Sequence, residues 1–153
     1  MAVLEFGINI GMKNLLEIKY YSSSDKVFDP NIRAKFLTGL KSYVTEVYDD
    51  KINVIAFSGF EIVCYFKMIQ SPDELDKKPE PLLSYAIIEK GTDPDFVKQH
   101  LKEIISYFLE RYPTNDIFSK DPKYFTKSEA RIGEILGDLR FKVGDRIKSV
   151  FGI

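Results

Sequence analysis

The chain has 153 residues, so we expect one domain over 1–153, and its 44% hydrophobic and 29% charged residues are typical of a globular protein. The net charge of −1 provides no global field that would attract nucleic acid or an anionic membrane. Cys64 is the only cysteine, which excludes an intramolecular disulfide and favours a reducing, cytoplasmic setting.

The first third of the chain combines two strands with one amphipathic helix. Apolar residues alternate along Val3–Ile10 and again along Leu16–Tyr20, with a turn at 11–14 between them. This pattern predicts an antiparallel hairpin with one solvated face. Asp29 is a good helix N-cap, the next residue is a proline, and the helical repeat that follows predicts a helix over 30–48.

Three more strands are predicted in the middle of the chain. They cover Ile52–Phe57, Phe60–Ile69 and Leu82–Glu89, and the Ser58-Gly59 pair between the first two is a tight-turn signal. Leu82–Glu89 is apolar on both faces, whereas a strand with one solvated face alternates between apolar and polar residues. We therefore expect this strand at the centre of the sheet.

The last third of the chain predicts two helices. Asp93 and Pro94 repeat the N-cap and proline pattern, and the helix that they begin is expected to end at Tyr112 before a proline. The segment 114–125 has no clear period. Thr126-Lys127-Ser128-Glu129 matches a capping box, so a final helix is expected from there to Val150. The predicted order of elements is ββαβββαα.

No catalytic or metal-binding signature accompanies this order. His100 is the only histidine and has no nucleophile near it in sequence, so we interpret it as a half-exposed surface residue. One histidine and one cysteine are too few for a zinc site. An enzyme would require carboxylates such as Glu61 and Asp138 to converge. We therefore expect no catalytic residue, no metal and no cofactor.

The sequence also argues against nucleic acid and membrane insertion. Lys120, Lys123 and Lys127 lie near Tyr124 and Phe125, but interspersed carboxylates dilute their charge. No run approaches the roughly 18 apolar residues of a membrane span. We therefore expect neither nucleic acid as a partner nor an integral membrane segment.

Two features exceed what a simple core requires. On the helix at 30–48, Phe36 and Tyr43 lie seven residues apart on a flank beside the predicted buried stripe, which makes the apolar arc unusually wide. This flank either packs against a loop or binds a partner. On the strand at 52–57, the residues Asn53, Ile55 and Phe57 share one face, and as an edge strand it would allow strand addition by a partner.

The order and lengths of these elements resemble those of the longin domain over nearly the whole chain. The resemblance rests on the first hairpin, the helix over 30–48, the Ser58-Gly59 hairpin and the helix that begins at Asp93-Pro94. It implies an α+β fold with a five-stranded antiparallel sheet sandwiched by helices. The first helix would cover one face and the last two helices the other, with the second and third strands at the edges and the fifth inside.

The resemblance also implies a function in protein binding. Longin domains serve vesicle trafficking and small-GTPase regulation, and they bind through the first helix and the third strand. The implied partner is a small GTPase or another longin or roadblock domain, in a homodimer or heterodimer, in the cytoplasm and held at membranes only through a partner. The partner-binding residues implied here are Phe36, Tyr43, Asn53, Ile55 and Phe57.

Two other functions fit a sheet covered by helices. One is a small-molecule sensory domain, which would require an enclosed pocket between the sheet and a helix. The other is a profilin-like actin-binding domain, which an actin polymerisation assay would distinguish.

Overall fold

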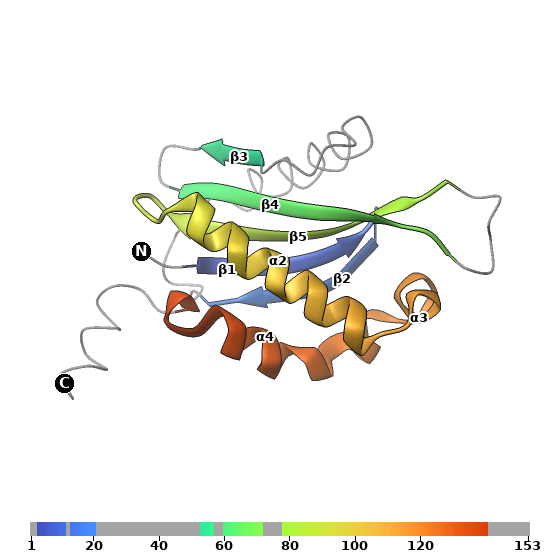
Figure 1. Ribbon diagram of the computed structural model, residues 1–153. Coiled ribbons are helices and arrows are strands. Elements are labelled where there is room, and N and C mark those ends of the chain that lie inside the picture. Colours follow the sequence, from blue (N-terminus) through green and yellow to red (C-terminus); the bar gives the residue numbers. More distant parts are fainter. Residues whose placement is uncertain (1–2, 12, 21–52, 57–59, 72–77, 141–153) are drawn as a thin grey trace.

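The computed structural model describes residues 3–11, 13–20, 53–56, 60–71 and 78–140. Within them, an antiparallel sheet is built from four long strands: β1 (Val3–Ile10), β2 (Lys13–Lys19), β4 (Phe60–Ile69) and β5 (Glu80–Glu89). A short strand, β3 (Asn53–Ala56), pairs with β4 and extends the sheet at that side. The strand order is β2-β1-β5-β4-β3 (Figure 1).

The centre of the sheet is apolar on both faces. β5 lies between β1 and β4, and all its residues from Pro81 to Ile88 are buried. β1 is buried along its whole length. The expected central place of the fifth strand, with the second and third strands at the edges, is confirmed. The near-continuous apolar run of this strand is the sequence signal for burial on both faces.

Helix α2 (Pro94–Arg111) begins and ends where the sequence predicts. The Asp93 carboxylate accepts a hydrogen bond from the Asp95 N–H at 3.0 Å, which satisfies one of the free donors of the first turn. Tyr112 is the C-cap, and the proline after it cannot continue the helix. The buried stripe of α2 recurs at helical spacing and contains Val97, Leu101, Ile104, Ile105 and Phe108.

Four short helical segments follow α2. They are α3 (Thr114–Ser119), the 3-10 helix η1 (Pro122–Ser128), α4 (Glu129–Leu136) and the 3-10 helix η2 (Gly137–Arg140). Figure 1 shows α2 crossing the sheet, with α4 running beside it on the same face. Side chains of α2, η1 and α4 share one apolar core with β1, β2, β4 and β5. None of the described helices combines the length and the hydropathy of a membrane span.

The expected fold class, a five-stranded sheet sandwiched by helices in the order ββαβββαα, is wrong. Three α-helices follow the strands where two were expected, and the sheet consists of four long strands with a four-residue edge segment rather than five full strands. The helix expected over 30–48 lies outside the described residues. The described α-helices α2 and α4 pack on a single face of the sheet.

The expected continuous helix from Thr126 to Val150 is also wrong over its described part. The Thr126 hydroxyl does not cap a helix but donates to the Lys123 carbonyl oxygen at 2.9 Å inside η1. α4 begins three residues later and ends at Gly137, whose φ of +55° is a conformation that glycine adopts at little cost. Glycine at this position was a stop signal that the helical repeat of apolar residues obscured.

Gly7 of β1 allows a close approach at the centre of the sheet. Tyr85 of β5 lies directly opposite it in the antiparallel register. A Cβ atom added to Gly7 would lie 2.3 Å from two ring carbons of Tyr85. Gly7 has no positive φ, unlike Gly11 and Gly91, so its role is to provide space for the tyrosine ring.

We expect Gly7→Ala to lower the free energy of unfolding by about 1–3 kcal/mol, because the added methyl group must displace a fully buried ring. Urea unfolding followed by circular dichroism measures the change. Gly91→Ala is the control, since no atom lies within 4 Å of its added Cβ and only the strain of its φ of +91° remains. In Gly7→Ala/Tyr85→Leu, stability should partly recover relative to Tyr85→Leu alone. If the effects of the two substitutions on the free energy of unfolding are additive, the steric explanation is contradicted.

Candidate functional site

The structure describes two of the five predicted partner-binding residues. Phe36, Tyr43 and Phe57 lie outside the described residues. Asn53 and Ile55 lie in β3, at the register positions opposite Cys64 and Ile62 of β4. The structure therefore brings these two positions together on one strand.

β3 forms the outer side of the sheet next to β4. Its four residues pair with Glu61–Cys64, and within the described residues β3 has no second strand neighbour. An edge strand presents alternate N–H and C=O groups away from its neighbour, and these groups can receive a further strand. The expected edge position of this strand agrees with the strand order, and partner binding by its residues stays a prediction.

Behind this edge, the part of β4 from Ile62 to Cys64 is buried on both faces. Tyr65 faces α2, where the Lys102 ammonium lies 5.7 Å from its ring centroid. Because strand side chains alternate, Ile62, Cys64 and Phe66 occupy the opposite face, and all three are buried. Burial raises the pKa of the Cys64 thiol from 9.0 to about 12, so it stays protonated at neutral pH and is a poor nucleophile.

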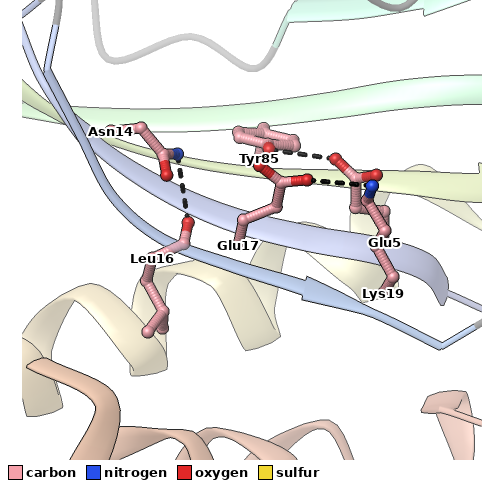
Figure 2. Close-up of polar contacts among 6 residues, drawn as sticks. All are labelled: Glu5, Asn14, Leu16, Glu17, Lys19 and Tyr85. Atoms are coloured by element: carbon pink, nitrogen blue, oxygen red, sulfur yellow. Dashed lines mark hydrogen bonds and ion pairs between the residues drawn. The ribbon is translucent and has the colours of Figure 1, made fainter. Parts of the chain in front are cut away.

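The face of the sheet opposite α2 contains a buried polar pair. The Tyr85 hydroxyl of β5 donates to a Glu5 carboxylate oxygen of β1 at 3.0 Å (Figure 2). Both side chains are 0% exposed. A buried carboxylate is costly unless hydrogen bonds satisfy it, so the tyrosine hydroxyl is part of what makes this position tolerable.

Further polar contacts continue this cluster onto the edge strand β2. The Lys19 ammonium lies 3.3 Å from a Glu17 carboxylate oxygen, and Lys19 is the cross-strand register partner of Glu5 (Figure 2). The Asn14 amide donates to the Leu16 carbonyl oxygen at 3.2 Å and to the buried Asn9 side-chain oxygen at 2.7 Å. The Asn14 contacts lie at a register shift between β1 and β2, where the ladder is irregular.

This cluster stabilises and aligns strands. A one-residue slip of β1 against β5 would move Glu5 to the opposite face, away from the tyrosine hydroxyl, so the pair favours the observed register. The sequence pattern did not predict this pair, because it predicts a solvated face for the first hairpin, whereas β1 is buried on both faces. The available signal was an ionisable residue inside a run that is otherwise buried.

The other sequence candidates have ordinary surroundings. His100 is half-buried on α2, and its Nδ1 lies 2.8 Å from the Phe96 carbonyl oxygen, which confirms its interpretation as a boundary residue. Glu61 lies in β4 opposite Ala56, and Asp138 lies in η2. Within the described ranges, no three His, Cys, Asp or Glu side chains group in a way that could hold a metal ion.

Comparisons with known proteins do not assign this chain to a family. No protein-family model matches the chain, and no curated protein sequence matches it. Proposals about its function therefore depend on the sequence and on the geometry described above.

Two tyrosines allow a matched test of the buried polar pair. Tyr85→Phe should lower the free energy of unfolding by about 2 kcal/mol, because it removes the hydroxyl that hydrogen-bonds the Glu5 carboxyl. Tyr112→Phe should leave stability within about 0.5 kcal/mol or raise it, because this buried hydroxyl has no hydrogen-bond partner in the described part of the chain. Urea unfolding measures both changes. Equal effects of the two substitutions would contradict a stabilising role for the pair.

Proposed function

We propose that this chain is a protein-interaction module related to longin domains. It acts as a scaffold or regulator of small GTPases or vesicle trafficking, in the cytoplasm. Its partner is a small GTPase or another longin or roadblock domain, bound in a homodimer or heterodimer. Binding uses β3 together with the flank of the preceding segment that carries Phe36 and Tyr43.

The observation that carries this proposal is the position of β3. It pairs on one side with β4, a strand of ten residues whose centre is buried on both faces. A short edge strand supported by a rigid neighbour is a suitable template for strand addition, because the main-chain groups are held in place before the partner arrives.

The order of the strands supports the relation to longin domains. The order of helices differs from the expected one, but β2 and β3 lie at the edges and β5 lies inside, as the resemblance implies. The central β1–β5 pairing joins the β1–β2 hairpin to the part of the sheet formed by β5, β4 and β3.

Charge substitutions on the proposed surface test the function. Phe36→Asp, Tyr43→Asp and Asn53→Arg should each weaken self-association, or binding to a small GTPase from a purified panel, by about tenfold or more. Light scattering measures self-association, and surface plasmon resonance with each GTPase in its GDP and GTP forms measures binding. The control is Phe96→Asp, because Phe96 is 54% exposed on α2 and lies outside the proposed surface.

Circular dichroism first establishes which variants remain folded, and Asn53→Arg provides a substitution that removes no aromatic ring. The proposal fails if the wild-type chain is monomeric and binds no GTPase in either nucleotide state. It also fails if Phe96→Asp weakens association as much as the three substitutions on the proposed surface.

A further inference from the structure

A second surface lies at the opposite edge of the sheet from β3. It is built around Tyr124 of η1, the helix that packs on the edge strand β2. Tyr124 is 43% exposed and is one of two large hydrophobic side chains exposed in the described ranges. We call this the Tyr124 surface and define it by Lys13, Arg111, Lys120, Lys123 and Tyr124.

Two regions distant in sequence, the start of β2 and the segment that joins α3 to η1, meet at this surface. The Lys13 ammonium at the start of β2 donates to the Lys120 carbonyl oxygen at 2.6 Å, which ties the β1–β2 end of the sheet to the end of α3. The Lys120 ammonium lies 5.5 Å from the centroid of the Tyr124 ring. Figure 1 shows α3 beside the end of the sheet where β1 leads into β2.

Two carboxylates of this region, those of Asp116 and Asp121, accept hydrogen bonds from neutral donors, whereas the cations of the region form no ion pair in the described part of the chain. Asp116 accepts from the Tyr124 hydroxyl at 3.0 Å, and Asp121 accepts from the Lys123 backbone N–H at 3.0 Å. Within the described residues, no ion pair involves Lys13, Lys120, Lys123 or Arg111. Glu80, beside Gly11, is a further carboxylate at this end of the sheet.

The Tyr124 side chain is an exposed aromatic ring whose hydroxyl stays protonated and therefore uncharged. Its hydrogen bond to Asp116 is the main cause that raises the pKa of Tyr124, and the nearby Tyr112 hydroxyl acts in the same direction. The two rings lie 5.7 Å apart between centroids. The Tyr112 hydroxyl is buried and has no hydrogen-bond partner in the described part of the chain.

The groups of this surface that lack an anionic partner in the described part of the chain are therefore cations around an exposed ring. They are the ammonium groups of Lys13, Lys120 and Lys123 and the Arg111 guanidinium, whose carbon lies 5.5 Å from the Tyr112 ring centroid. The complementary ligand carries negatively charged acceptors and apolar surface.

We propose that the Tyr124 surface binds an acidic segment of a partner protein. Carboxylates of that segment pair with Lys13, Lys120 and Lys123, and an apolar side chain packs on the Tyr124 ring. The nearby Asp116 and Asp121 disfavour a continuous phosphate backbone or an anionic bilayer, which would bring negative charge against both, whereas separate carboxylates can avoid them. This site is independent of the proposed function at β3, because β2 and β3 are opposite edges of the sheet.

Fluorescence anisotropy with the full chain tests this inference. The probe is a fluorescein-labelled peptide of alternating Glu and Ser with one central Phe, and its counterpart has Gln in place of every Glu. We expect the Glu peptide to bind at low ionic strength, to bind more weakly as salt is added, and to bind more tightly than the Gln peptide. Lys120→Glu/Lys123→Glu should weaken binding about tenfold, and Tyr124→Ala about fivefold.

The matched control is Lys90→Glu/Lys98→Glu, which makes the same change of charge at the other end of α2 (Figure 1). Its affinity for the Glu peptide should stay within about twofold of the wild-type value. The proposal is overturned if the control weakens binding as much as Lys120→Glu/Lys123→Glu, or if the Gln peptide binds equally well. Tighter binding of oligothymidylate or of phosphatidylserine vesicles than of the Glu peptide would also overturn it.

Discussion

The burial of β5 on both faces between β1 and β4 is the constraint on which the rest of the structure depends. A strand in this position needs side chains that fill space on two sides and leave no polar group without a partner. Toward α2 it contributes Leu82, Ala86 and Ile88 to the main core. On the opposite face Tyr85 fits because Gly7 has no side chain and because Glu5 accepts its hydroxyl hydrogen bond.

Because of this constraint, the centre of the sheet is buried and only its edges are available to bind a partner. Two-sided burial decreases toward β2, where Glu17 and Lys19 are exposed, and β3 forms the other edge. The two proposed binding surfaces lie at these opposite edges. One offers main-chain groups of β3, and the other offers ammonium groups and an aromatic ring beside β2.

Local signals allowed much of the fold to be predicted, and contacts between distant residues account for most of what was missed. Asp93 caps the start of α2 with its side chain, and Pro94 restricts the backbone of the first helical residue. The apolar run of β5 indicates its burial directly. The Glu5–Tyr85 pair joins residues 80 positions apart, so no window of sequence contains it. Gly137 ends α4 although the apolar repeat continues, because backbone conformation overrides periodicity there. Of the predicted partner-binding residues, Asn53 and Ile55 lie on the edge strand β3. Their spacing in the sequence predicted a strand but could not by itself show that this strand lies at an edge.

Native-state hydrogen exchange of the full chain, resolved by residue with NMR, tests the central claim most directly. If β5 is the doubly buried centre and β3 is an available edge, the amide protons of Tyr85 to Ile88 exchange only through global unfolding, whereas those of β3 exchange by smaller openings and at least about tenfold faster. Exchange of β3 amides as slow as that of β5 would contradict the account, because β3 would then not be an available edge.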